Sequence, residues 1–419
     1  MRHKPTLNYS GLTVILENQS RFDNCELISG YAGHLFQGAL GIPRQACDIR
    51  LLNTLGEGFL PDTKVILLLG QKALSTFKNA SIGEQRGCPW VAHNRTYIAT
   101  FAPQDAIDRK AYFNPLSNET EMDYETARHG KTKRSNWRFW LLRDVAKAAQ
   151  YLKVPPRPES GELITYPKEQ EILDLLTNTK GQEMFFDIET NKHLEMTCFG
   201  FSFGPDKGWC VPMLQVNHYY YDNTHKVLRA LAVALRDNTV IIHNALFDLF
   251  VIAYRYGIPA PTKVFDTMLS HHRLFPEVEK SLGHCISLYT DQPYHKNEGC
   301  FNPHTSSEFQ RLYEYNIKDV LTMALIKPTL DSLSKTLRAE KSIEQVNSMV
   351  KPYLTAMLQG LRIDTPELRM ITMHNERYQY QLRRILGLLL GRELNPNSPK
   401  QVSAYLYEGL GLKKPDRDL

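Results

Sequence analysis

The sequence predicts an α/β protein in which short buried strands alternate with helices. Val65–Leu69 is a continuous apolar run closed by Gly70, which is typical of a strand buried on both faces. Residues 184–186 form another apolar run, which leads directly into Asp187 and Glu189. Segments with helical spacing of apolar residues follow both runs, and this alternation indicates layers of helices on sheets.

Length and composition define the class of molecule. The 419 residues suit two or three domains, and a hydrophobic fraction of 42% is normal for chains with packed cores. A net charge of +5 is compatible with a nucleic-acid partner. The 7 cysteines show neither a CxxC pair nor zinc-type spacing, which argues for a reducing compartment. Because no signal peptide or membrane-length apolar run is present, we expect a soluble cytoplasmic protein with no membrane partner.

Residues 1–153 are predicted to form a first α/β domain. A further buried strand is expected at 97–101, a polar loop at 114–133, and a closing helix at 137–151. Prolines then cluster within 154–161, and this composition predicts an extended linker that joins no core.

Residues 162–335 are predicted to form a second α/β domain around a strand at 184–190. Its other elements are expected in this order: a helix opened by Pro167, antiparallel strands at 196–203 and 208–213, a helix at 225–236, a strand at 239–242, and helices at 246–256, 267–274 and 306–330, with a kink or end near Pro328. Residues 336–419 are predicted to be helical, with Ser398 capping the last helix. Helices without a partner layer form an incomplete domain by themselves.

Several acids define a candidate site. Because side chains alternate along a strand, Asp187 and Glu189 leave the same face, where a divalent cation would relieve their repulsion; a strand end that turns into solvent is the alternative. Asp248 falls in the first turn of a helix, where ordinary capping is the alternative. Tyr315 and Asp319, at i and i+4, share one helix face, which is alternatively a solvated face. Asp266 is interpreted as a helix cap.

Taken in order, Asp-x-Glu, Asn-x-x-x-Asp and Tyr-x-x-x-Asp resemble the DEDDy group of DnaQ-like 3′→5′ exonucleases, most closely the proofreading domain of family A DNA polymerases. The resemblance covers 162–335 and includes the segments 265–269 and 281–284. It departs at an insert, 291–306, to which the sequence assigns no role. The resemblance implies a ribonuclease H-like fold and phosphodiester hydrolysis with two Mg²⁺ or Mn²⁺ ions.

The same resemblance implies a role for each motif residue. Asp187 would bridge both metals, and Glu189 and Asp319 would hold the metal that carries the attacking water. Asp248 would hold the second metal, largely through water. Tyr315 would orient the attacking water with its hydroxyl.

Candidate nucleic-acid contacts lie in two places. Thr190, Leu194 and Asn244 match positions that contact the 3′-terminal nucleotide in the family; a turn residue, a core leucine and a helix cap are the alternatives. A basic stretch that faces no acid is a candidate for phosphate contacts or, alternatively, a solvated loop. Its residues are Lys131, Lys133 and Arg134, with Arg128, His129 and Arg138. Trp137 and Trp140 are predicted to be core residues rather than base-stacking platforms.

Residues 359–364, 397–401 and 406–411 resemble the start of the thumb of family A polymerases, whose palm and fingers do not follow in this chain. We therefore expect no polymerase activity from this chain alone. It is interpreted either as a split-gene subunit, completed by a second chain that carries palm and fingers, or as a truncated chain. A phage origin would place it in the cytoplasm of a bacterial host.

The first domain resembles the uracil-DNA glycosylase superfamily. The segments that carry this resemblance are 29–35, 69–74, 82–87 and 99–103. Ala102-Pro103 stands where that family has a His-Pro pair, and only Glu17 can replace its activating acid. We therefore predict a non-catalytic platform that holds DNA or docks a subunit.

The sequence as a whole predicts a metal-dependent 3′→5′ exonuclease that acts on single-stranded 3′ ends of DNA, as the proofreading part of a phage-type replicative polymerase. The alternatives are an inactive exonuclease fold that serves as a DNA-binding scaffold, a ribonuclease of the same fold, and a base-excision enzyme centred on the first domain.

Overall fold

The structure is a computed structural model that describes residues 11–16, 47–52, 63–102, 137–158, 161–215, 218–219 and 221–413. The chain divides into two compact units, 1–358 and 359–419. Within the first unit we refer to the described residues up to 158 as the N-terminal region and to 161–358 as the central region. The described residues from 359 onward are the C-terminal region.

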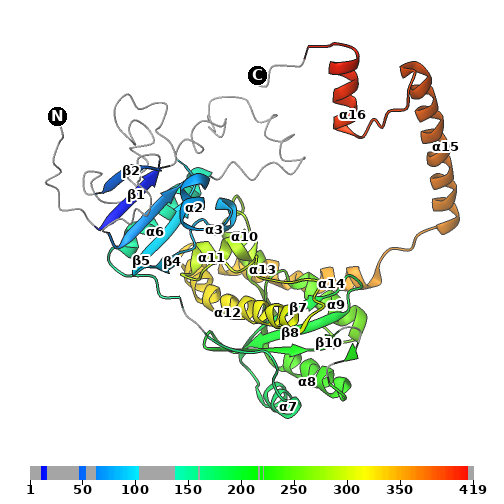
Figure 1. The fold of residues 1–419 in the computed structure, drawn as a ribbon. Helices are drawn as coiled ribbons and strands as arrows, with labels where there is room; N and C mark the ends of the chain where they lie inside the picture. Colours follow the sequence, from blue (N-terminus) through cyan, green and yellow to red (C-terminus); the bar gives the residue numbers. More distant parts are fainter. Residues whose placement is uncertain are drawn as a thin grey trace, which may run out of the picture. The chain divides into compact units, whose positions relative to one another are not determined.

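The N-terminal region is a sheet covered by helices on both faces (Figure 1). Its strands are β1 (Leu12–Leu16), β2 (Asp48–Leu51), β3 (Val65–Leu69), β4 (Trp90–Ala92) and β5 (Arg95–Thr100), in the order β2-β1-β3-β5-β4. Among these strands β4 alone is antiparallel to its neighbour. Helix α6 (Trp137–Tyr151) packs on one face, and α2 (Gln71–Phe77) and α3 (Ile82–Gln85) pack on the other. The continuous apolar run of β3 is therefore buried on both sides, as the sequence predicts.

The central region is built on a mixed six-stranded sheet, ordered β13-β12-β7-β8-β9-β6. Its strands are β6 (Glu162–Ile164), β7 (Glu183–Thr190), β8 (Met196–Ser202), β9 (Lys207–Pro212), β12 (Thr239–Ile242) and β13 (Lys263–Asp266). Strand β12 is parallel to β7 and β13, and β8 is antiparallel to β7 and β9. A separate two-stranded ladder joins β10 (Leu214–Gln215) and β11 (His218–Tyr219).

Helices cover both faces of the central sheet. They are α7 (Glu169–Asn178), α8 (Thr224–Asp237), α9 (Ala245–Tyr256), α10 (Thr267–Leu274), α11 (Leu282–Tyr289), α12 (Ser306–Thr336), α13 (Glu340–Ser348) and α14 (Val350–Gln359). Residues of α7, α8, α9 and α14 share one core with one face of β7, whereas residues of α11 and α12 form the core on the other face. The helix predicted over 306–330 continues through Pro328 to Thr336, because Ile326 and Leu330 are buried on either side of the proline.

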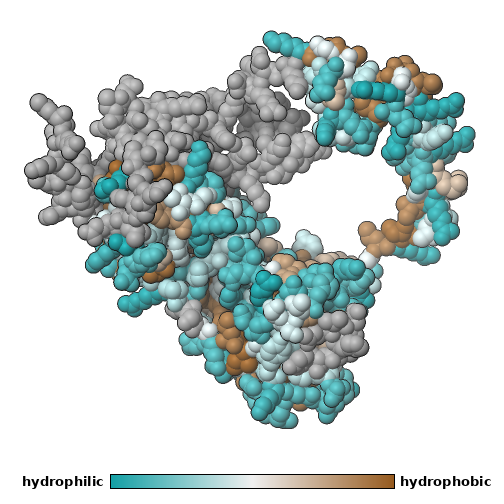
Figure 2. All heavy atoms as spheres, viewed as in Figure 1, coloured by the Kyte–Doolittle hydropathy of each residue, from teal (hydrophilic) through white to brown (hydrophobic). Residues whose placement is uncertain are grey.

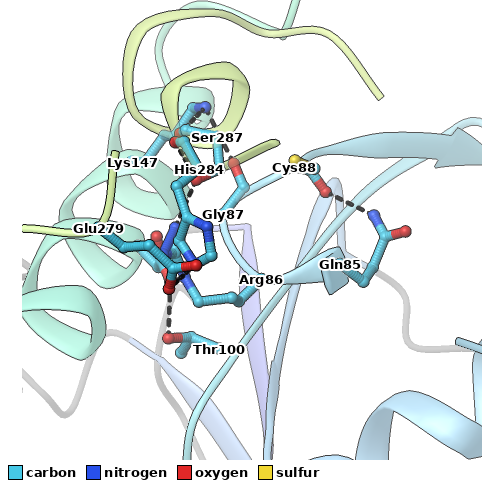
Figure 3. A network of polar contacts seen from close by, with 10 residues as sticks. Gln85, Arg86, Gly87, Cys88, Thr100, Lys147, Glu279, His284 and Ser287 are labelled. Atoms are coloured by element: carbon cyan, nitrogen blue, oxygen red, sulfur yellow. Dashed lines mark hydrogen bonds and ion pairs between the residues drawn. The ribbon is translucent and has the colours of Figure 1, made fainter. Parts of the chain in front are cut away.

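A buried polar network joins the N-terminal region to α11 (Figure 3). Arg86 Nε donates to Asp144 Oδ2 at 3.1 Å, and Arg86 Nη2 donates to Ser287 Oγ at 2.5 Å. Lys147 Nζ donates to three backbone carbonyls, those of Gly87, Ser287 and Thr290, at 2.9, 2.9 and 2.6 Å. We call Arg86, Asp144, Lys147 and Ser287 the Arg86 network. Trp140, predicted as a core residue, is buried with the Arg86 guanidinium 3.6 Å from its ring centroid.

The C-terminal region contains α15 (Thr365–Leu390), α16 (Pro399–Ser403) and a π-helical turn (Ala404–Gly409). Ser398 caps α16 by accepting from the N–H of Gln401, which confirms the predicted helix start. Helix α15 buries no residue, and Leu388 and Leu389 are 76% and 78% exposed. Figure 2 shows apolar side chains at the surface of this region. None of the described helices combines the length and the apolar character needed to cross a membrane.

Candidate active site

Strand β7 directs two acids toward α12. Its residues Met184, Phe186 and Ile188 belong to the core beneath α7, α8 and α9, whereas Phe185 belongs to the core beneath α12. Because side chains alternate along the strand, Asp187 and Glu189 share the face of Phe185. The predicted same-face pair is therefore present.

Helix α12 crosses this face and supplies the third acid. Metal-ligating oxygens of Asp187, Glu189 and Asp319 all lie within 4.8 Å of one another. Asn316 on the same helix donates from Nδ2 to Oδ2 of Asp187 at 2.8 Å. This approach requires Gly200 on β8, where an added Cβ would lie 2.3 Å from Oδ1 of Asn316.

Asp248 approaches β7 from the first turn of α9. Its side chain is 3% exposed, and Oδ1 accepts from the backbone N–H of Ile188 at 3.0 Å. It is not one of the three acids whose oxygens converge within 4.8 Å. Asp248 thus lies beside the convergent group, a position compatible with a second cation held largely through water. We call Asp187, Glu189, Asp248 and Asp319 the carboxylate cluster.

Burial and mutual repulsion perturb the carboxylate cluster strongly. Burial, followed by the charge of Asp319, raises the pKa of Asp187 to about 7. Burial and the charge of Asp187 also raise the pKa of Glu189 and of Asp248 well above their ordinary values. These groups resist ionisation side by side, and a cation among them would remove that penalty.

The predicted insert, 291–306, ends at the first residue of α12, and its residues 291–305, which lie between α11 and α12, cover Asp319 and Tyr315. His295 Nε2 lies 2.8 Å from Oδ1 of Asp319, and Lys296 Nζ donates to Oδ2 at 2.6 Å. The Lys296 ammonium also lies 4.1 Å from the centroid of the Tyr315 ring, and Phe301 packs edge-on against that ring. The sequence assigned no role to this insert, and the structure brings it into the site.

Opposing influences act on the pKa of Asp319, whereas those on Tyr315 all raise its pKa. Burial raises the pKa of Asp319, but Lys296 and His295 outweigh it, so the pKa lies below its ordinary value. Burial, followed by the charges of Asp319, Glu189 and Asp187, raises the pKa of the Tyr315 hydroxyl. Tyr315 therefore remains a neutral hydrogen-bond donor at physiological pH.

The three candidate nucleotide contacts lie around the strand and helix ends. Thr190 ends β7, and Leu194 in the following turn has φ +60° while packing partly buried against the core. Asn244 has φ +72° and precedes α9, and its backbone N–H donates to Oδ1 of Asp266 at 3.2 Å. Asp266 caps α10 by accepting from the N–H groups of Met268 and Leu269, which confirms its interpretation as a cap.

The donor set fits a hard divalent cation. Carboxylate oxygens are the ligands that Mg²⁺ and Mn²⁺ prefer. Three of them converge here, and burial together with like charge raises the pKa of Asp187 and Glu189.

Sequence reasoning missed three residues of the site: Asn316, His295 and Lys296. Asn316 directly follows Tyr315 within the Tyr315–Asp319 spacing, and its place at i−3 from Asp319 was the available signal. His295 and Lys296 belong to an irregular segment, which carries no periodic signal. Lys131, Lys133 and Arg134 lie outside the described residues, as does the side chain of Arg138.

Residues 167–335 match the family model of a 3′–5′ exonuclease. The matched segment contains β7, α9 and α12, and with them the whole carboxylate cluster. This part of the chain is therefore similar to a 3′–5′ exonuclease domain, which agrees with the predicted activity class. No curated protein is significantly similar to the chain.

Several solved structures are similar to the chain. Brucella melitensis NrnC is 21% identical over 48% of this chain and 95% of its own, with a TM-score of 0.38. Escherichia coli RNase D, an exoribonuclease involved in structured RNA processing, is 13% identical over 46% of this chain and 51% of its own, with a TM-score of 0.37. The POL domain of Pol1 from M. smegmatis is 17% identical over 60% of this chain and 42% of its own, with a TM-score of 0.39. Likenesses at this level leave the substrate open.

Proposed function

We propose that the chain is a metal-dependent 3′→5′ exonuclease that hydrolyses single-stranded 3′ ends of DNA. Its role would be proofreading for a polymerase of family A. The observation that carries the proposal is the carboxylate cluster, whose convergent oxygens lie in a segment that matches a 3′–5′ exonuclease family. Two Mg²⁺ or Mn²⁺ ions are the proposed cofactors.

Each residue of the site has its own proposed role in the reaction. Asp187, Glu189 and Asp319 would hold one cation, and Asp187 with Asp248 would hold the other. When bound, two such cations supply an attacking hydroxide and stabilise the leaving oxygen. Tyr315, whose raised pKa keeps its hydroxyl protonated, would orient the attacking water by a hydrogen bond. Asn316 would hold the carboxylate of Asp187 in place.

DNA is the proposed substrate on two grounds. Residues 359–411 contain segments that resemble the thumb start of family A polymerases, and the matched family model is named after DNA polymerase A. We propose a second chain with palm and fingers as a partner. The N-terminal region, which has Ala102 where a glycosylase has histidine, is proposed as a non-catalytic DNA-holding or docking platform.

The direct test is degradation of a 5′-labelled single-stranded DNA with Mg²⁺ or Mn²⁺. We expect a ladder of products shortened from the 3′ end. Asp187→Ala should lower the rate by at least about 10³-fold, since both cations lose a shared ligand. Asp206→Ala, an exposed acid in the turn between β8 and β9, is the matched control and should leave the rate within about twofold.

The same assay separates the alternatives. DNA that is bound but not shortened with either ion would overturn the proposal in favour of a scaffold. A strand of the same sequence with 2′-hydroxyl groups tests the ribonuclease alternative, and its faster degradation would overturn the choice of DNA. Release of free base would indicate activity of the N-terminal region, contrary to its proposed role.

A further inference from the structure

The insert at 291–305 is held at its start by the N-terminal region. Tyr151 on α6 donates from Oη to Oδ1 of Asp291 at 2.6 Å, and the backbone N–H of Arg157 lies 3.3 Å from Oδ2 of the same residue. Just before it, the carbonyl of Thr290 accepts from the buried Lys147 at 2.6 Å. The first residue of the insert is therefore fixed to the N-terminal region rather than to the central sheet.

The middle of the insert occupies both oxygens of Asp319. His295 Nε2 lies at Oδ1 and Lys296 Nζ at Oδ2, at 2.8 and 2.6 Å. The Asp319 side chain is 4% exposed and that of Lys296 23%, so water screens this ion pair only in part. Lys296 also contacts the face of the Tyr315 ring. The insert thus places the Lys296 ammonium on a carboxylate that the proposed function needs as a metal ligand.

A divalent cation and the Lys296 ammonium compete for the carboxylate oxygens of Asp319. The oxygens of Asp187, Glu189 and Asp319 converge within 4.8 Å, so a cation bound among them lies near Lys296 Nζ. Like charges at such a separation repel strongly in a partly buried site. Metal binding must therefore either displace Lys296 from Oδ2 of Asp319 or proceed against the repulsion between the two cations. Either one lowers the affinity of the site for the metal.

We propose that Lys296 is a built-in competitor of the divalent cation for Asp319, and that the N-terminal region holds it in position through Asp291. The inference rests on the proposed metal site and adds to it a residue that sets metal affinity. It also connects the N-terminal region to the exonuclease site through one chain segment. Asp291 at the start of this segment is hydrogen-bonded to Tyr151, and Lys296, five residues further along, contacts Asp319.

The test is calorimetric titration of the full chain with Mn²⁺ alone, at fixed pH and ionic strength. Lys296→Met removes the charge and keeps the length of the side chain, and we expect Mn²⁺ to bind at least about tenfold more tightly. Lys296→Gln should do the same if Lys296→Met does not fold, as judged by its thermal melt. Lys296→Arg, which keeps the charge, should stay within about threefold of the wild type.

A matched charge removal serves as the control. Lys335 is exposed near the end of α12, and Lys335→Met should leave Mn²⁺ affinity within about twofold. The tether is tested by Tyr151→Phe, which removes the hydroxyl that holds Asp291 and should tighten Mn²⁺ by about two- to fivefold. An unchanged affinity for Tyr151→Phe would overturn the role of the N-terminal region.

The outcomes for Lys296 separate this inference from the proposed function. Unchanged or weaker Mn²⁺ binding by Lys296→Met would overturn the inference, and if Asp187→Ala still abolishes binding, the metal site itself stands. If neither the wild type nor the Lys296 variants bind Mn²⁺, both the proposed function and the inference fail.

Discussion

Two clusters of buried charge in the described part of the first unit are compensated in different ways. In the Arg86 network, Asp144 accepts from Arg86 and also from Thr100 at 2.8 Å, while Lys147 donates to three carbonyls. In the carboxylate cluster, the described residues set four acids against the Lys296 ammonium and three further polar groups. These are the imidazole of His295, the amide of Asn316 and the backbone N–H of Ile188.

This difference in charge compensation indicates how a ligand site can be recognised in a folded chain. Buried groups of opposite charge that hydrogen-bond each other compensate one another's charge. They also fix the relative positions of the chain segments that carry them. Carboxylates that are buried together raise each other's pKa, and their negative charge is not fully compensated. The Arg86 network is therefore interpreted as structural, and the carboxylate cluster as a site that a cation completes.

The largest effect on stability is expected from a substitution in the Arg86 network. Asp144→Ala leaves the guanidinium of Arg86, 1% exposed, without its carboxylate, and should lower the free energy of unfolding by about 3–5 kcal/mol. Urea unfolding followed by circular dichroism measures it. Glu162→Ala removes the exposed partner of Lys207 and should cost less than about 1 kcal/mol. Equal losses in the two variants would break the comparison.

The carboxylate cluster should make the free energy of unfolding depend on pH. Asp187 has a pKa of about 7 in the folded protein and 3.8 as its ordinary value, so between these pH values the folded chain binds a proton that the unfolded chain has released. Without divalent ions, the free energy of unfolding should therefore fall by about 2–4 kcal/mol as pH rises from 4 to 7.

Asp187→Asn is the control for this pH dependence. It removes one titrating carboxyl, and with it a charge that raises the pKa of Glu189 and Asp248, so it should reduce the slope. Saturating Mg²⁺ should reverse the loss at pH 7, since the ion binds the folded state. Thermal unfolding in a chelator and in Mg²⁺ gives both curves. A stability that rises from pH 4 to 7 in the chelator would contradict the assignment of raised carboxylate pKa values.

A smaller effect is expected from Gly200. A Cβ at this position would lie 2.3 Å from Oδ1 of Asn316, so Gly200→Ala must push α12 or the Asn316 side chain away from β8. We expect a loss of about 1–3 kcal/mol in unfolding free energy, with a lower nuclease rate because Asn316 leaves Asp187. Gly204→Ala, with open space around its Cβ, is the matched control. A neutral Gly200→Ala would show that the helix has room to move.

What the sequence predicted depended on periodicity and spacing. The alternation of β7 placed Asp187 and Glu189 on one face, and the helix at Thr267–Leu274 with Asp266 as its cap was confirmed residue by residue. The role of Asn316 depends on how closely α12 approaches Gly200, which is a property of tertiary packing. The contacts of Lys296 depend on an irregular segment fixed by a distant helix, and no local pattern records them.

Pro328 has a consequence for how α12 opens. A proline has no N–H, so the carbonyl of Ala324 loses its intrahelical donor and the hydrogen-bond ladder of the helix is interrupted there. The turns that carry Tyr315 and Asp319 lie before this interruption, and the last turns, which end at Thr336, lie after it. In hydrogen exchange, the end of α12 can therefore fray and reclose as a unit of its own while amides around Asp319 stay protected. The proline separates the local opening of the helix end from the site.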